Sequence, residues 1–447
     1  MKKRRFVASL MTLAMLVSML SGCSFGSSSK KVTQIYFLSC KPEVKSVWEE
    51  VSAAYEKETG IKLKVLTAAD GNHERTLKAE LAKKDYPTMF QINGPVEYGK
   101  WKNYCMDLSD TKLYSWLLDK SMAVTGDNGK GVYGIPYVVE GYGIIYNNAI
   151  MDKYFALSDK TSQIKSVEEI NNFAALKEVV EDMQAHKSEL GIEGVFGSTS
   201  LSPGDSWRWH THLMNIPITY ELQDKNASDL DSIDFTYSDE FKNVFDLYVN
   251  NSCTPASELT DKGVEDSMQE FAQGKAAMIQ NGNWGWTQIE STDGNVVKQE
   301  DAKYMPIYTG MDGEESQGLC IGTENYICIN SQATDEEKQA SIDFLEWLYS
   351  SKEGKKFVTE KFGFIPPFST FKESEYPSNP LAVEVLEYMN DSSRKSVPWN
   401  FVTFPNQKFK DNMGSDLTLY VNGEMDWDTL VDTVKADWIN QKSSEEE

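Results

Sequence analysis

The sequence predicts an α/β protein with two lobes, and three observations lead to this prediction. The chain has 447 residues, which exceeds the size at which a single hydrophobic core keeps growing, so two bodies of ordinary domain size are expected. Its early part alternates strand, helix, strand, helix and strand, an order typical of a parallel sheet covered by helices. Its composition, 40% hydrophobic and 12% aromatic, supplies enough apolar side chains for a core in each lobe.

The elements of this first α/β unit can be placed in order. Pro42 begins a helix whose apolar residues recur at the spacing of one helical face, and Gly60 ends it. A second helix carries Leu77 and Leu81 on its buried face. The strands around these two helices are expected at 32–38, 61–66 and 87–92.

Later helices are marked by their start signals. Ser166 with Glu169, and Thr334 with Glu337, have the spacing of capping boxes, in which two side chains bond the free N–H groups of a first helical turn. Pro380 marks another start, because proline suits the first position of a helix. The later helices are expected at 167–184, 335–350, 380–389 and 427–438.

The N-terminus reads as an export signal followed by a lipid attachment site. Residues 1–22 contain four basic residues and an apolar run, and small residues precede Cys23. The ending Leu-Ser-Gly-Cys resembles the bacterial lipobox, which implies cleavage after residue 22 and a lipid on Cys23. The small, polar segment 23–31 suits a flexible tether. We therefore expect a lipoprotein on the outer face of the cell membrane.

Charge and cysteine content exclude several classes of partner and site. Removal of the signal leaves 40 Lys and Arg against 68 Asp and Glu, a formal charge of −28. Nucleic acid and anionic lipid surfaces are poor partners for such a protein. The five cysteines after Cys23 are scattered and form no CxxC pair, so neither a disulfide framework nor a zinc site is expected, although one bridge stays open.

Aromatic and polar residues gather in the loops where a parallel α/β sheet binds its ligands, at the carboxyl ends of the strands. A single tryptophan in a loop is more often part of the core than of a binding site. Several of them in such loops shift the balance toward binding. These loops are 39–43, 91–101, 136–147, 202–210 and 281–286.

Three motifs carry a resemblance to a known family. The segment "FAQGKAAMIQNGNWGW" (271–286) resembles the part of maltose-binding-protein-like, family 1 extracellular solute-binding proteins that leads to a ligand-stacking tryptophan. "GVYGIPYVVEGYGIIYN" (131–147) is similar to the family's first crossing strand, and "PTMFQINGP" (87–95) to another strand, with Thr88 where Asp is usual. "GFIPPF" (363–368) matches late in the chain. The resemblance implies a two-lobe, periplasmic-binding-protein-like fold that binds a carbohydrate for an ABC importer.

This resemblance also implies a binding site. The C–H faces of a sugar lie flat on aromatic rings, and its hydroxyls need donors and acceptors together. Trp284 would be the platform, with Trp286 packed behind it, and Glu140 would be the strongest acceptor because it is charged. The whole expected set is Trp284, Glu140, Asn93, Arg208, Trp207, Lys41, Glu43, Tyr142 and Trp399.

Each supporting residue has a structural alternative that the sequence leaves open. Glu140 could instead pair with Arg208 or with a lysine, and Asn93 could serve only a turn. Lys41 and Glu43 lie where a helix start is explanation enough. Trp399 or Phe404 could line the site or belong to the core.

An enzyme is the alternative class. A secreted, acidic, tryptophan-rich chain could be a glycoside hydrolase, which needs two carboxylates about 5.5 Å apart or wider. Glu140 has no such partner in the loops above, and no nucleophile, metal or phosphate-binding motif appears. His210 and His212 would point to opposite faces of a strand. We therefore expect a binding protein without cofactor or metal.

The expected organisation follows from the crossing strands of this family. The first crossing is expected near 143–147, the second within 321–329, and the last after 363–368. The body is then divided into lobe one, lobe two and an acidic tail. Lobe one is expected at 32–145 plus 326–370, lobe two at 146–325 plus 371–440, and the tail at 441–447. We expect a monomer that docks on the membrane permease of the importer.

Overall fold

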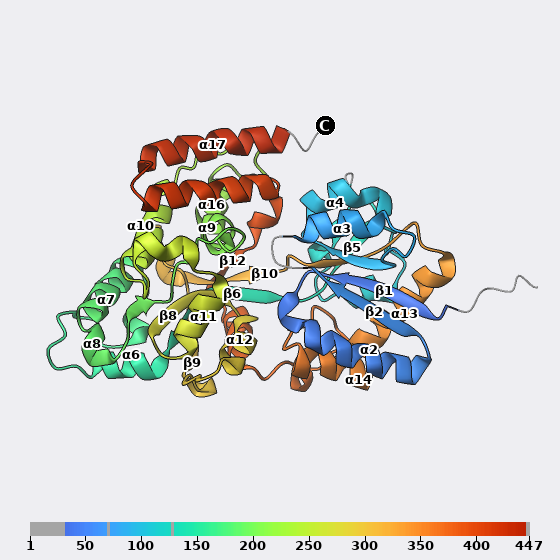
Figure 1. Ribbon diagram of the computed structural model, residues 1–447, viewed down its shortest axis with the longest axis horizontal. Coiled ribbons are helices and arrows are strands. Elements are labelled where there is room, and N and C mark those ends of the chain that lie inside the picture. The colour runs from blue at the N-terminus through green and yellow to red at the C-terminus, as the bar shows by residue number, and fades with distance from the viewer. Residues whose placement is uncertain (1–31, 69–71, 127–128, 444–447) are drawn as a thin grey trace, which may run out of the picture.

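The computed structural model describes residues 32–68, 72–126 and 129–443. Their helices and strands gather into two bodies that lie side by side and are linked by a few extended segments (Figure 1). We call them the N-terminal lobe, which contains β1, and the C-terminal lobe, which contains β6. The expected signal, Cys23 and the tether lie outside the described residues. Within these residues, no helix is both long and apolar enough to cross a membrane.

The N-terminal lobe is built on a six-stranded sheet with the order β2-β1-β3-β11-β5-β4. The first three strands are parallel, as the alternation of strands and helices predicts, and β11 runs antiparallel between β3 and β5. Its strands are β1 (Gln34–Ser39), β2 (Lys62–Thr67), β3 (Met89–Ile92), β4 (Val124–Thr125), β5 (Val132–Pro136) and β11 (Tyr326–Ile329).

Helices cover this sheet and bury their apolar faces on it. In α2 (Lys45–Thr59), Trp48, Val51 and Tyr55 share the buried face, and Gly60 ends the helix at a φ of 73° that suits glycine. The side chain of Thr334 accepts from the N–H of Glu337, so the predicted capping box of α13 is confirmed. The other helices are α3 (His73–Leu81), α4 (Pro95–Trp101), α5 (Lys112–Trp116), α13 (Asp335–Ser350) and α14 (Lys352–Lys356).

The C-terminal lobe contains the second sheet, with the order β12-β10-β6-β8-β7, and β9 also pairs with β6. The central strand β6 runs antiparallel to β10, β8 and β9 and is buried along its whole length. The strands are β6 (Glu140–Asn147), β7 (Gly194–Phe196), β8 (Ala276–Gly282), β9 (Ala302–Met305), β10 (Gln317–Gly322) and β12 (Lys395–Pro398).

The helices of the C-terminal lobe surround this sheet, with α16 and α17 together at one edge of the lobe (Figure 1). A π-helical turn, η5 (Arg208–Leu213), leads directly into α9. The helices are α6 (Asn148–Phe155), α7 (Phe173–Ala185), α8 (Lys187–Leu190), α9 (Met214–Asp224), α10 (Ser238–Asn250), α11 (Val264–Ala272), α12 (Gly285–Ser291), α15 (Pro380–Asn390), α16 (Gln407–Val421) and α17 (Trp427–Ser443).

Three segments join the lobes and contact one another. The N–H of Tyr137, between β5 and β6, donates to the carbonyl of Asn325, between β10 and β11 (2.9 Å). Two residues on, the N–H of Val139 donates to the carbonyl of Ile365 (2.9 Å). The chain changes sheets between β5 and β6, ahead of the expected segment 143–147, because β6 pairs within the second sheet from Glu140 onward. The division into lobes at 145 and 370 stays a prediction.

Two local predictions were wrong. The helix expected from residue 167 begins at Phe173, because Ser166 makes no capping bond and the side chain of Asn172 accepts from the N–H of Ala175 instead (3.0 Å). The segment 202–210, expected to be a loop, is helical from Trp207. The two histidines therefore lie on a helix and not on a strand. All five cysteines among the described residues are unbridged.

Candidate ligand-binding site

Five ring-bearing side chains gather in the C-terminal lobe where it meets the N-terminal lobe. Trp284 lies 6.4 Å from Trp207, 5.7 Å from His212 and 6.4 Å from Trp399, measured between ring centroids. Tyr142 stacks on His212 at 3.9 Å with the rings almost parallel. Trp207 and Trp284 are half-buried, whereas the other three rings are buried. We call these five residues the aromatic cluster.

Trp284 owes its position to the end of β8. The strand ends at Gly282, and Trp284 is the residue before α12. A Cβ atom on Gly282 would lie 2.0 Å from the Trp284 ring, so the ring lies against a backbone that only glycine leaves open. Trp286 is 5% exposed and packs in the apolar core below. The two tryptophans of the "NGNWGW" segment thus differ in environment, as the sequence predicts.

The π-helical turn η5 places His212, and Trp207 just before the turn, in the aromatic cluster. Pro217 lies inside α9 and has no N–H to offer to the preceding turn. The hydroxyl of Tyr142 donates to the carbonyl of His212 (3.0 Å), which fastens this turn to β6. Such turns are rare in helices and frequent at functional sites. The sequence shows the proline but gives no sign of the changed helical register.

A buried ion pair stands beside the aromatic cluster. The ammonium of Lys41, from the loop after β1, lies 2.8 and 3.1 Å from the two carboxylate oxygens of Glu140, the first residue of β6. Lys41 is 8% and Glu140 1% exposed. The same ammonium lies 5.6 Å from the centroid of Trp284, within the range of a cation–π contact. Lys41 therefore connects the N-terminal lobe to both β6 and Trp284, and Glu140 pairs with a lysine and not with Arg208.

Arg208 lies inside the C-terminal lobe. It is 2% exposed, its Nη1 donates to the hydroxyls of Ser200 (3.1 Å) and Ser267 (2.9 Å), and its guanidinium faces the Trp207 ring at 5.2 Å. Burial lowers the pKa of Arg208 to about 10. The structure thus places this residue against Trp207, with little surface of its own for a ligand.

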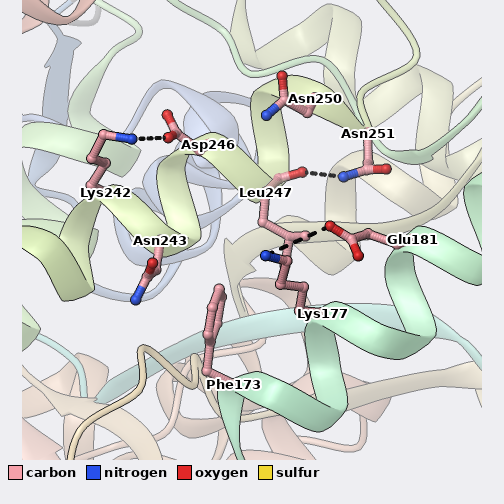
Figure 2. A pocket seen from close by; sticks show the side chains of 9 residues that line it. All are labelled: Phe173, Lys177, Glu181, Lys242, Asn243, Asp246, Leu247, Asn250 and Asn251. Atoms are coloured by element: carbon pink, nitrogen blue, oxygen red, sulfur yellow. Dashed lines mark hydrogen bonds and ion pairs between the residues drawn. The ribbon is translucent and has the colours of Figure 1, made fainter. Parts of the chain in front are cut away.

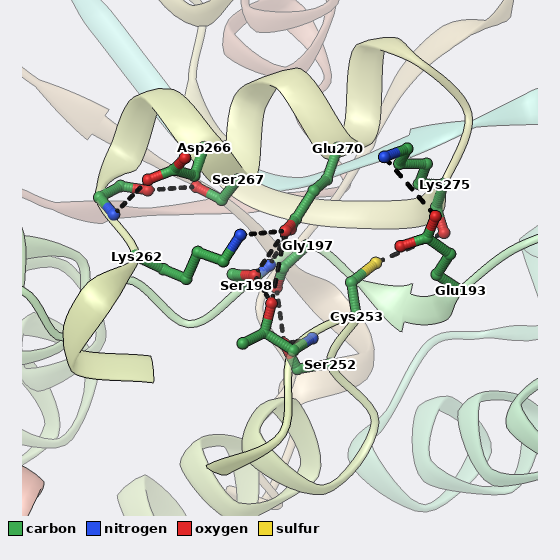
Figure 3. Close-up of polar contacts among 12 residues, drawn as sticks. Glu193, Gly197, Ser198, Ser252, Cys253, Lys262, Asp266, Ser267, Glu270 and Lys275 are labelled. Atoms are coloured by element: carbon green, nitrogen blue, oxygen red, sulfur yellow. Dashed lines mark hydrogen bonds and ion pairs between the residues drawn. The ribbon is translucent and has the colours of Figure 1, made fainter. Parts of the chain in front are cut away.

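A polar network holds the loop that Arg208 contacts. Figure 3 shows Glu270 of α11 reaching the segment after β7, where its carboxylate accepts from the N–H (2.7 Å) and the hydroxyl (2.8 Å) of Ser198. Two residues on, Ser200 adopts a φ of 58°, which is uncommon for a residue with a side chain. The network holds the loop that contains Ser200. Arg208 bonds to the hydroxyl of Ser200 and faces Trp207, so this loop supports both side chains.

The remaining predicted residues lie around the same junction in different roles. The N–H of Asn93 donates to the carboxylate of Glu97 (2.8 Å) as the chain turns into α4, and its side chain is half-buried. Gly94 follows at a φ of 89°, and its Cα faces Val402 of the C-terminal lobe. Trp399 is 6% exposed, as expected of a core residue at the edge of the cluster. The side chain of Glu43 lies outside what the structure describes.

The two histidines of η5 are buried and uncharged. Burial lowers the pKa of His210 to about 3 and holds that of His212 well below its usual range. The histidine of the aromatic cluster is therefore uncharged at physiological pH, and the charged side chains beside the cluster are those of Arg208, Glu140 and Lys41.

Sequence reasoning missed three polar residues at this junction. Glu324 lies in the linking segment between β10 and β11 and is half-buried. His73 is 9% exposed and bonds the carbonyl of Gln91 through Nε2 (2.8 Å), whereas its Nδ1 has no partner in the described structure. Gln91 is fully buried and accepts from the N–H of Cys40 (2.8 Å). The signal for Glu324 was present, because an acidic residue stands inside an expected crossing strand.

A separate hollow of about 300 Å³ lies between α7 and α10. Figure 2 shows that its walls carry charged and amide side chains, including the ion pairs Lys177–Glu181 and Lys242–Asp246. Helix α7 lies at the end of the molecule away from the N-terminal lobe (Figure 1). The hollow is thus distinct from the aromatic cluster and receives no residue from the other lobe.

Solved structures with the same fold cover nearly the whole chain. A chitin oligosaccharide binding protein superposes with a TM-score of 0.70 at 18% identity, covering 92% of this chain and all of its own. The solute-binding protein RafE in complex with raffinose has a TM-score of 0.69 at 19% identity, covering 92% and 99% of the two chains. A sugar transporter protein from Bacillus licheniformis in complex with stachyose gives 0.63 at 17%, covering 91% and 100%. The two-lobe α/β fold predicted from the sequence is confirmed.

Sequence comparison finds a relative of assigned function. The melibiose/raffinose/stachyose-binding protein MelE of Bacillus subtilis (strain 168) is 28% identical over 148 residues. This match spans about a third of each protein, 32% of this chain and 34% of MelE. Residues 50–384 match the family described as bacterial extracellular solute-binding protein, which is most of the chain. The chain therefore belongs to the bacterial extracellular solute-binding protein family.

Proposed function

We propose that this protein captures a neutral oligosaccharide outside the cell and delivers it to the membrane permease of an ABC importer. The observation that carries the proposal is Trp284: a half-buried ring that lies against Gly282, beside Trp207, and near the ammonium of Lys41 from the other lobe. A partly exposed aromatic ring suits the C–H face of a sugar. The names of MelE and of the solved structures, which refer to oligosaccharides, support the same ligand class.

Binding between the lobes accounts for the mixture of groups at the junction. The C-terminal lobe offers aromatic rings, whereas Lys41 and Asn93 come from the N-terminal lobe and Glu324 from a linking segment. A ligand held by both surfaces would favour the arrangement in which the lobes approach each other. Hinge closure of this kind is the established behaviour of periplasmic binding proteins. The closed form would be the one that docks on the permease.

The lipid anchor and the monomeric state belong to the same proposal. A lipid on Cys23, followed by the polar tether, would keep the protein on the outer face of the membrane near its permease.

The ligand residues proposed from the sequence stay in the proposal, but the structure changes the order of their expected importance for binding. Trp284 comes first, Asn93 and Lys41 follow, and the buried Glu140, Arg208 and Trp399 act through Lys41, Trp207 and the cluster.

The test is a binding screen that also detects turnover. The mature protein is mixed with raffinose, stachyose and chitotriose, and its melting temperature is measured, because a ligand that binds only the folded state raises it. At a ligand concentration of 100 times Kd the stabilisation is about 2.7 kcal/mol. We expect saturable binding with the sugar recovered intact by chromatography. Cleaved product would favour the glycoside hydrolase alternative, and no stabilisation by any of these sugars would contradict the proposal.

A further inference from the structure

We propose that Glu324 is a ligand-binding carboxylate, which accepts hydrogen bonds from sugar hydroxyls at the point where the two lobes are joined. This inference rests on the proposed function and names a residue that determines which sugars fit. Glu324 lies in the three-residue link between β10, in the C-terminal lobe, and β11, in the N-terminal lobe. It is half-buried.

The backbone on both sides of Glu324 is fixed. The carbonyl of Asn325 accepts from the N–H of Tyr137 in the neighbouring link (2.9 Å), and its side-chain oxygen is hydrogen-bonded by the thiol of Cys40. The hydroxyl of Tyr326 donates to the carbonyl of Thr323 (3.3 Å). Glu324 therefore projects from a rigid segment, as a residue that must be pre-positioned for a ligand should.

The same segment contacts the aromatic cluster. A Cβ atom on Gly322 would lie 2.6 Å from the Trp399 ring, so this tryptophan lies against the backbone two residues before Glu324. Trp399 is in turn 6.4 Å from Trp284. The hydroxyl of Thr323, which is 6% exposed, has no hydrogen-bond partner in the described part of the chain. A buried, unpartnered hydroxyl thus stands beside the carboxylate and next to the proposed platform.

Charged groups from both lobes surround Glu324. Burial raises the pKa of Glu324, whereas Lys410 of α16, Lys41 of the loop after β1 and His73 of α3 lower it, and Glu97 of α4 raises it. Tyr142 and Tyr326 are close enough to be affected by its charge.

None of these groups satisfies the carboxylate directly. Among the described residues, none forms an ion pair with Glu324 within 4.0 Å or bonds its side chain. Covering this carboxylate with a ligand is costly unless groups of the ligand donate hydrogen bonds to it. Hydroxyl donors from a ligand would remove that cost.

Two expectations about the ligand follow from this environment. First, the ligand should present hydroxyl donors here, because a charged carboxylate can only accept hydrogen bonds. Second, binding should be linked to a proton. Burial raises the pKa of Glu324, and Lys410 and Lys41 oppose that rise only in part. Hydroxyls that donate to the carboxylate favour its charged form, so ligand binding should lower this pKa and release a proton at mildly acidic pH.

The experiment measures affinity and proton release together. Raffinose is titrated calorimetrically into wild type, Glu324→Gln and Glu324→Ala at several pH values, in two buffers of different ionisation enthalpy. We expect wild type to release a proton and to lose affinity as the pH falls. The variants should release none and should bind about 10- to 100-fold more weakly at neutral pH, the range expected for hydrogen bonds to a charged group.

Two controls separate a binding role from a structural one. Asp416→Asn removes another carboxyl with a raised pKa, in α16, where burial and Asp437 of α17 raise it, and should change neither affinity nor proton release. Thermal melts show whether the Glu324 variants fold. Folded variants that bind raffinose with wild-type affinity and proton release would overturn the inference. If the wild-type protein binds stachyose or chitotriose but not raffinose, the titrations are made with that sugar. If it binds none of the three sugars, the proposed function and this inference are overturned together.

Discussion

Replacing Trp284 by alanine should weaken sugar binding much more than it weakens the fold. The ring is half-buried, lies against Gly282, and has aromatic neighbours at centroid distances of 5.7 to 6.4 Å. Its loss removes a platform for the ligand, for which a buried aromatic hot spot suggests about 2–4 kcal/mol. At 1.4 kcal/mol per factor of ten, the expected loss of affinity is roughly 30-fold to several hundred-fold.

Trp286→Ala is the matched control. This ring is 5% exposed and belongs to the core beneath β8, so its deletion should cost about 3–5 kcal/mol of unfolding free energy with a smaller effect on affinity. Calorimetric titration and denaturant unfolding give the affinity and the free energy of unfolding of each variant. Wild-type affinity together with a large loss of stability in Trp284→Ala would show that the ring is a core residue and refute the assignment.

Three further predictions concern other parts of the chain. Cys23→Ala should leave the fold intact and move the protein from the membrane to the soluble fraction, and a variant still in the membrane fraction would contradict the lipid anchor. Lys41→Met should cost about 3–5 kcal/mol of unfolding free energy, because it leaves the buried carboxylate of Glu140 without a partner. The double variant Lys41→Met/Glu140→Gln should regain most of that loss. Equal losses in the single and the double variant would argue against the pair. The pKa of Asp416 is raised to about 6 by burial and by Asp437, so its charged form opposes folding as the pH rises through 4 to 6. Asp416→Asn should therefore be more stable than wild type at pH 7 and equal to it near pH 4, and urea unfolding at both pH values decides this.

The sequence predicted those elements whose signals are local. Gly60 ends α2 and Thr334 caps α13 as expected, because a left-handed turn or a capping box involves only residues close together in the chain. The different environments of Trp284 and Trp286 were also predictable, since Trp284 comes two residues after the glycine that ends a strand. The start of α7 was missed because two capping signals compete within six residues, and Asn172 forms the bond that Ser166 does not.

The partners of the charged residues could not be predicted. Glu140 pairs with Lys41, 99 positions away, and Arg208 bonds to Ser267, 59 positions away. These contacts depend on how the two sheets and the π-helical turn come together, which no short sequence pattern records. The surroundings of Glu324 also come from both lobes, so its environment could not be predicted, although an acidic residue inside an expected crossing strand was visible in the sequence.

The central claim is that a sugar binds between the lobes, and a crystal structure of the protein with the oligosaccharide that raises its melting temperature most tests it directly. The account predicts that one sugar ring lies on the accessible face of Trp284 and that hydroxyls lie within hydrogen-bonding distance of the Glu324 carboxylate. Density for the sugar only in the hollow between α7 and α10, or only elsewhere on the surface, would contradict the account.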